Sequence, residues 1–176
     1  MSPAKFIIRE ARAKEHPVIG ALMVEVYSQL EGFPTPEEQP KYYEMLTNVG
    51  TLTQKPQVHL LAAYSPAQVL AGCVLYIGDM QYYASGGTAT REENSAGFRL
   101  LAVDPRFRGQ GIGKLLTKFC MEMAREERRQ QLIIHSTKAM QVAWAMYQRM
   151  GFRRSEDLDF MQGTLEVYGF RLPLGD

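Results

Sequence analysis

The sequence has few of the residues that bind metals or form cross-links. Its 176 residues include two cysteines, Cys73 and Cys120, and three scattered histidines. Both cysteines lie in apolar segments without metal-ligand spacing, so neither a zinc site nor a disulfide scaffold is indicated. We interpret them as buried thiols in a reducing compartment, and the alternative is one disulfide between them. No metal is expected.

The sequence also lacks an excess of charge of either sign. Lys and Arg number 20 and Asp and Glu number 19, which gives a formal net charge of +1. Without a basic surplus, binding to a nucleic-acid backbone is disfavoured. No apolar run approaches the roughly 20 residues that cross a bilayer, and the charged start of the chain has no signal-peptide core. We expect a cytoplasmic protein that binds neither nucleic acid nor membrane.

The composition is that of an ordinary globular protein, with 45% hydrophobic and 22% charged residues. The length predicts a single domain over residues 1–176, with enough chain to bury a core without cross-links. A homodimer is expected only because dimers are common among soluble proteins.

Hydrophobic periodicity and turn residues divide the chain into strands and helices. The expected helices are 17–32, 42–50, 111–127 and 138–150, and the expected strands are 5–10, 58–64, 69–77, 98–103, 132–135, 152–153 and 165–172. The order β-α-α-β-β-β-α-β-α-β-β predicts an α/β (α+β) architecture, a mixed sheet with helices on both faces.

The segment between Asp79 and Ser95 is long for a connection between two strands. Two interpretations stay open for it, a loose connector and a lid or substrate-binding loop.

The segment from Leu101 to Lys114 carries the clearest chemical signal. A strand ends, and a glycine-rich loop then opens a helix. Gly109, Gly111 and Gly113 leave backbone N–H groups open to a close ligand. Those groups lie at a helix N-terminus, where the helix dipole favours an anion. The segment therefore predicts a phosphate or pyrophosphate site.

Two known phosphate-binding templates do not fit this loop. A P-loop needs Gly where Arg108 stands and a hydroxyl where Leu115 stands. A dinucleotide fingerprint needs its third Gly at Lys114 or Leu116, depending on where it starts.

A third template fits. The run Arg-Gly-Gln-Gly-Ile-Gly at 108–113 resembles the Q/R-x-x-G-x-G/A signature of the GNAT superfamily, the GCN5-related N-acetyltransferases. Downstream, residues 143–152 resemble the A-x-x-x-Y-x-x-x-G-F block of the same family. The resemblance covers nearly the whole chain and implies a mostly antiparallel sheet of about seven strands.

The resemblance implies acetyl-CoA as the cosubstrate. Its pyrophosphate is expected on the backbone N–H groups of the glycine loop, and its pantetheine arm along the strand before the loop, which splays from strand 132–136. Met140 stands where family members often carry a cofactor-contacting Asn. The implied cofactor-binding residues are Leu101, Ala102, Val103, Arg108, Gly109, Gln110, Gly111, Ile112, Gly113 and Lys114.

The resemblance also implies direct attack of an amine on the thioester. Tyr147 matches the position of the family's acid tyrosine, and the alternative is a core aromatic. His135 is the candidate general base, because a His pKa near ~6.5 suits that role; the alternative is a structural histidine. Glu25, Glu31 and Asp79 are rival bases, although ordinary surface charge is the simpler interpretation of each.

The acceptor is the least defined part of the prediction. Tyr27, Glu31 and Arg99 are the candidate substrate residues, and Arg99 is expected either to bind an acidic substrate group or to pair with a neighbour. The wider expected groove adds Phe33, Tyr42, Tyr43, Tyr82, Tyr83, Glu92 and Glu93. The predicted function is transfer of acetyl to a primary amine of a small molecule or a peptide or protein. Alternatives are a non-catalytic acyl-CoA-binding module and, less favoured, O-acyl transfer or a longer acyl donor.

Overall fold

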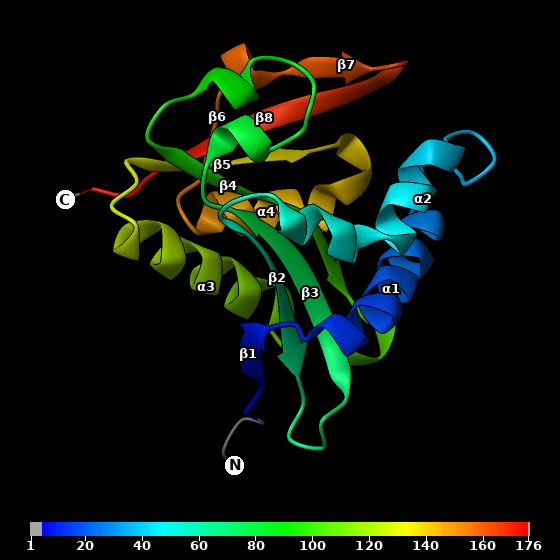
Figure 1. Ribbon diagram of the computed structural model, residues 1–176. Helices are drawn as coiled ribbons and strands as arrows, with labels where there is room; N and C mark the ends of the chain where they lie inside the picture. The colour runs from blue at the N-terminus through cyan, green and yellow to red at the C-terminus, as the bar shows by residue number, and fades with distance from the viewer. Residues whose placement is uncertain (1–4, 176) are drawn as a thin grey trace.

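A twisted, mostly antiparallel sheet forms the centre of the computed structural model, which describes residues 5–175 (Figure 1). The order of neighbouring strands is β1-β2-β3-β4-β5-β8-β6, and β7 pairs with β8. Only β4 and β5 are parallel. The strands are β1 (Ile7–Glu10), β2 (Val58–Tyr64), β3 (Leu70–Ile77), β4 (Ser95–Val103), β5 (Gln131–Ser136), β6 (Arg153–Arg154), β7 (Phe160–Gln162) and β8 (Leu165–Pro173).

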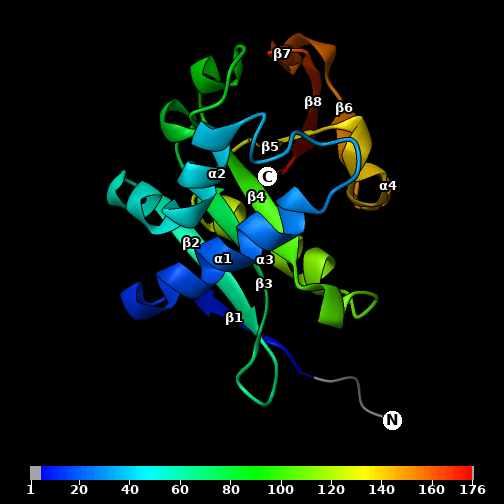
Figure 2. The same cartoon turned by 90° about the vertical axis from the view of Figure 1, so that its right-hand side faces the viewer.

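Four α-helices cover the two faces of this sheet. They are α1 (His16–Ser28), α2 (Pro40–Thr47), α3 (Ile112–Glu126) and α4 (Gln141–Arg149). In Figure 2, α1 and α2 cross the near side of the sheet, and β6, β7 and β8 gather on the side where α4 lies. The predicted fold class is confirmed. None of the helices in residues 5–175 is both long and apolar enough to cross a membrane.

The element boundaries differ from the prediction in a few places. The strand β7 was not predicted, because three residues are too few to show a periodic pattern. The last helix begins at Gln141, after a 3-10 turn over Lys138–Met140. The first helix ends at Ser28, before Gly32. Residues 1–4 and 176 of the predicted domain lie outside the described residues.

Each face of the sheet packs against one pair of helices. Ile19, Met23 and Leu46 of α1 and α2 are buried on one face, and α3 and α4 pack on the other. Helical spacing with Ile112 and Phe119 predicts that Leu115 belongs to the buried stripe of α3, but it is 39% exposed. The buried stripe instead consists of Ile112, Leu116, Thr117, Cys120 and Ala124.

Both cysteines are free and buried, as predicted. Burial raises the pKa of the Cys73 thiol to about 12, and it raises that of Cys120 further. Neither thiol is therefore ionised at neutral pH, and both act as small apolar side chains.

The segment between β3 and β4 is packed against the rest of the protein and is not a loose connector. It contains two 3-10 turns, Met80–Tyr82 and Ala89–Arg91. Thr88 donates a hydrogen bond to the Asp157 carbonyl at 3.0 Å, and Glu92 forms an ion pair with Arg171 of β8. These contacts hold the segment against the C-terminal strands.

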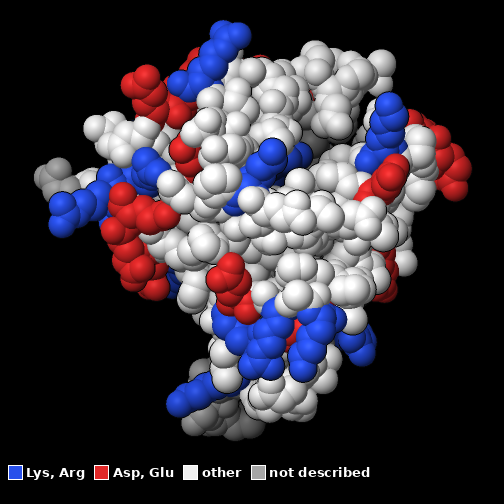
Figure 3. Space-filling view, viewed as in Figure 1, with Lys and Arg blue, Asp and Glu red and all other residues white. Residues whose placement is uncertain are grey.

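Charged side chains of both signs are scattered over the molecular surface in Figure 3. A hollow is visible between the surface over α2 and the surface over the β7–β8 hairpin. The hollow marks one side of the pocket described below.

Candidate active site

The centre of the sheet is open because its two parallel strands diverge. Pairing between β4 and β5 covers only Ser95–Gly97 with Gln131–Ile133, whereas β4 continues to Val103. Beyond Gly97 the edge of β4 that faces β5 has no strand partner. The splay that the family resemblance implied is therefore present.

A β-bulge interrupts β4 at the start of this gap. Ala102 pairs with Cys73 of β3, but Arg99 pairs with Leu75, so β4 carries one extra residue between these pairs. Leu100 takes a left-handed φ of +62°. A backbone of this kind is strained for a residue other than glycine and is held by its surroundings.

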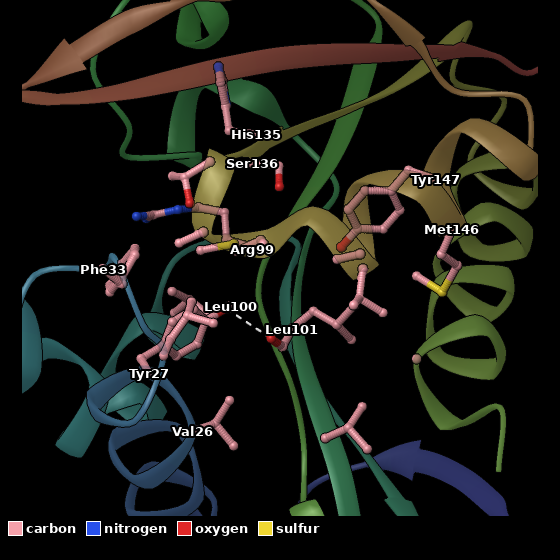
Figure 4. Close-up of a pocket in the computed structure, with 18 of the residues that line it drawn as sticks. Val26, Tyr27, Phe33, Arg99, Leu100, Leu101, His135, Ser136, Met146 and Tyr147 are labelled. Carbon is pink, nitrogen blue, oxygen red and sulfur yellow. Dashed lines mark hydrogen bonds between the residues drawn. The ribbon is translucent and has the colours of Figure 1, made fainter. Parts of the chain in front are cut away.

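Tyr27 of α1 supports the bulge. Its buried hydroxyl donates a hydrogen bond to the Leu101 carbonyl at 2.8 Å (Figure 4). Burial raises its pKa well above the usual value, so the hydroxyl stays protonated. The hydroxyl of this predicted substrate residue is thus used to position the main chain of β4.

Main-chain groups of β4 point into the gap. The Asp104 N–H donates to the Ala71 carbonyl of the neighbouring chain segment at 2.9 Å. Since antiparallel hydrogen bonding alternates along a regular strand, the N–H group of Val103 faces away from β3. Leu101 lies within the bulge and also lines the pocket. An extended ligand is able to pair with this edge as an added strand would.

The glycine loop presents free N–H groups at the N-terminus of α3. Gly109 and Gly111 both have a φ of +79°, and an added Cβ at either would meet nothing within 4 Å. The first helix-type hydrogen bond runs from the Leu115 N–H to the Gly111 carbonyl at 3.0 Å. The N–H groups of residues 112–114 therefore have no intrahelical partner, and this open cradle fits a pyrophosphate.

One pocket of about 910 Å³ joins this cradle to the gap and to the space beside α1 and α2. Among the predicted cofactor residues, Ala102 and Gln110 do not line it. Ala102 is buried on the α1–α2 face, and Gln110 points to solvent. The predicted residues that line it are Tyr27, Glu31, Phe33, Tyr42, Tyr83, Arg99, Leu101, Val103, Arg108, Gly109, Gly111, Ile112, Gly113, Lys114, His135, Met140 and Tyr147. Four residues of the wider expected groove do not line it: Tyr43, Tyr82, Glu92 and Glu93.

Two of the rival bases do not line this pocket. Glu25 is exposed on α1. Asp79 accepts hydrogen bonds from the main-chain N–H and the side chain of Gln81, so it caps a 3-10 turn. Glu31 remains as an exposed carboxylate at the edge of the pocket.

Tyr147 lies on α4 with its hydroxyl directed toward the pocket (Figure 4). The residue is 5% exposed, and its ring packs against Phe98 and Phe152. No hydrogen bond to its hydroxyl is found among residues 5–175. Burial raises the pKa of Tyr147, with smaller contributions from Tyr83 and Cys120, so the hydroxyl keeps its proton.

The ring of His135 is hydrogen-bonded at both nitrogens. Because the Leu158 carbonyl only accepts, Nε2 donates to it at 2.9 Å. Nδ1 then accepts from the Tyr83 hydroxyl at 3.1 Å. Burial is the main cause that lowers the pKa of His135. His135 is therefore a neutral imidazole whose accepting nitrogen is bound to the Tyr83 hydroxyl, and this partner was not predicted.

Two buried hydroxyls at the end of β5 have no hydrogen-bond partner among the described residues. Ser136 and Thr137 are 2% and 3% exposed, and both line the pocket. Figure 4 shows the Ser136 hydroxyl pointing into the pocket. Their place directly after the buried run Leu132–Ile134 was the only sequence signal for them.

A family model described as the acetyltransferase (GNAT) family matches residues 22–152. The chain belongs to this family. No match was found among curated proteins. Solved structures of GNAT proteins share the fold. One is an acetyltransferase of the GNAT family from Staphylococcus aureus Mu50, with 16% identity and a TM-score of 0.75, covering 97% of this chain and 100% of that one.

Two other solved N-acetyltransferase structures share the fold of this chain to a similar degree. The ribosomal-protein-S18-alanine N-acetyltransferase from Escherichia coli is 15% identical with a TM-score of 0.64, covering 98% of this chain and 96% of that one. The PaiA N-acetyltransferase from Thermoplasma acidophilum, solved with coenzyme A, is 16% identical with a TM-score of 0.68, covering 94% and 98%.

Proposed function

We propose that this GNAT protein transfers an acetyl group from acetyl-CoA to a primary amine. The observation that carries the proposal is the single pocket that runs from the free N–H groups of residues 112–114 to the Tyr147 hydroxyl. A peptide or protein amine and a small-molecule amine are both acceptors of this chemical type.

The residues present fit acetyl-CoA, which supplies an activated acyl thioester when it is bound. The N–H groups of residues 112–114 bind its pyrophosphate, and Arg108 and Lys114 add positive charge. The exposed edge of β4 from Leu101 to Val103 pairs with the pantetheine arm. Met140 offers no amide to that arm, and the unpartnered hydroxyls of Ser136 and Thr137 replace the missing polar contact.

We assign one residue to each step of the transfer. An amine must lose its proton before it attacks, since alkyl ammonium groups have a pKa near ~10.4. Tyr83 accepts that proton as it passes its own to Nδ1 of His135. The Leu101 N–H stabilises the negative charge that develops on the acyl oxygen. Tyr147 gives its proton to the departing sulfur, because a thiol has a pKa of about 8.5. The second proton, which the nitrogen loses as the amide forms, restores the Tyr147 hydroxyl.

The proton relay predicts a specific pH dependence. The relay needs neutral His135, so kcat falls as pH drops through the pKa of His135, which burial holds below its usual value. Tyr83→Phe removes the hydroxyl that connects the ring to the pocket, and general-base catalysis contributes about 10²-fold or more. We expect kcat to fall by that amount and the acidic limb to disappear.

The pH profile of kcat for Tyr83→Phe and His135→Gln measures this effect. Tyr82→Phe is the control, because Tyr82 neighbours Tyr83 in the chain but does not line the pocket. An acidic limb that persists unchanged in both relay variants would show that another group is the base.

Incubation with acetyl-CoA and a broad amine panel tests the function itself. The proposal predicts release of free CoA thiol that depends on the amine. A non-catalytic acyl-CoA-binding module is the second candidate, and it is favoured by Met140, which gives α4 no side-chain cap at the position where the family often has an Asn. That candidate predicts a melting shift with CoA and no amine-dependent thiol release.

A further inference from the structure

Arg99 places a positive charge inside the pocket, and no acidic side chain of residues 5–175 forms an ion pair with it. Its Nη1 donates to the main-chain carbonyls of Tyr83 at 3.1 Å and Ala84 at 3.4 Å. No ion pair between Arg99 and a carboxylate is found within residues 5–175. The Nε and Nη2 donors have no protein partner there, so one edge of the guanidinium fork is free.

The bulge in β4 sets the direction of this side chain. Arg99 pairs with Leu75, which is buried on the α1–α2 face of the sheet. The side chain therefore enters the part of the pocket beside α1 and α2, away from the glycine loop on α3. We call this part the acceptor half of the pocket. In Figure 4 the Arg99 guanidinium extends away from Tyr147.

The neighbours of Arg99 show that its charge acts within this space. Burial raises the pKa of Tyr42 to about 12, and the charge of Arg99 opposes that rise. The same charge helps burial to lower the pKa of His135. Arg99 is half-buried, so solvent screens its charge only in part, and a ligand anion at this position forms a charge-assisted pair with it.

The rest of the acceptor half is aromatic and restricted in size. Phe33, Tyr42 and Phe160 line it. Gln162 at the end of β7 and Gln39 in the loop between α1 and α2 line the same small cleft beside the pocket. The β7–β8 turn and that loop therefore lie side by side. This arrangement suits a small molecule with an apolar body rather than a large surface.

We infer that the acceptor is a small primary amine that also carries a carboxylate, an amino-acid-like molecule whose carboxylate binds the free edge of Arg99. This rests on the proposed acetyl transfer. The carboxylate forms a charge-assisted, two-point hydrogen bond with the guanidinium. The apolar body packs on the aromatic wall, and the amine is left to face Tyr83 and Tyr147.

Matched acceptor pairs test the inference. Standard amino acids and their decarboxylated amines, such as tyrosine with tyramine and phenylalanine with phenethylamine, differ only by the carboxylate. We expect wild-type kcat/KM to favour the amino-acid member of the best pair by about 100-fold, the size expected for loss of a charge-assisted two-point contact. Arg99→Gln removes this preference mainly through KM, and Arg99→Lys restores part of it.

Two controls separate this inference from the proposed function. Arg125→Gln removes an exposed arginine on α3. This control is expected to leave kcat/KM unchanged for both the amino acid and its decarboxylated amine. The CoA-dependent melting shift of Arg99→Gln reports whether the fold and the cofactor site are intact. Equal turnover of both members by wild type, or a preference that survives in Arg99→Gln, overturns the inference and leaves acetyl transfer standing.

Calorimetry with the protein–CoA complex tests the anion site without turnover. Amino acids are expected to bind wild type and to lose about 100-fold in affinity with Arg99→Gln. Failure of every amino acid to bind the wild-type complex overturns the inference. Binding that Arg99→Gln abolishes, without any acetyl transfer, supports the anion site and contradicts the proposed function.

Discussion

Substituting glutamate for Gly111 is expected to weaken CoA binding by about 100-fold or more, which corresponds to ~3 kcal/mol. Gly111 caps α3 in a left-handed conformation, and the space beside its Cα is open. A side chain there occupies the cradle, and its carboxylate lies beside the N–H groups that bind the pyrophosphate. The negative charge itself is compatible with a helix N-terminus. The substitution is therefore expected to reduce the affinity for CoA more than the stability of the helix.

Titration calorimetry with CoA measures this effect. Gly111→Asn is the matched control, because asparagine tolerates a left-handed backbone better than other residues and carries no charge. The expected order of affinity is wild type, then Gly111→Asn, then Gly111→Glu by a wide margin. Affinity in Gly111→Glu equal to that of wild type would mean that the pyrophosphate binds elsewhere.

The second large effect is expected from Tyr147→Phe, a fall in kcat of about 10²- to 10³-fold with unchanged affinity for CoA. The hydroxyl makes no hydrogen bond among the described residues, so its removal leaves the packing against Phe98 and Phe152 intact. The expected loss therefore comes from the proton transfer to the leaving sulfur that we propose for Tyr147. The melting temperature is expected to stay the same.

A change of leaving group checks this role of Tyr147. Acetyl donors whose thiols are more acidic than CoA need less protonation, so they are expected to reduce the defect of Tyr147→Phe. Single-turnover rates with such donors measure the effect. If kcat of the variant matches wild type at every pH, Tyr147 is a core aromatic and another group protonates the thiolate.

Local patterns predicted much of the architecture and the cofactor loop. The stretch from Gly109 to Gly113 is recognisable because glycine, helix start and preceding strand all lie within a few residues. The same holds for Tyr147, whose family motif is contiguous. These features depend on backbone preferences that neighbouring residues set.

Features that depend on distant contacts were not predictable. Leucine disfavours a left-handed backbone, so no local signal marks the bulge at Leu100. Tyr83 meets His135 across 52 residues of chain, and the long segment that carries Tyr83 is ordered by contacts with β8 and its neighbours. The exposure of Leu115 likewise follows from where α3 sits on the sheet rather than from its periodicity.

The most direct test of the account follows the acetyl group itself. Acetyl-CoA labelled in the acetyl carbons is incubated with the protein and the preferred amine, and mass spectrometry locates the label. Acetyl transfer predicts that labelled N-acetyl amine forms in a one-to-one ratio with free CoA. Label found only as acetate, or retained on CoA while the protein binds it, would contradict the account.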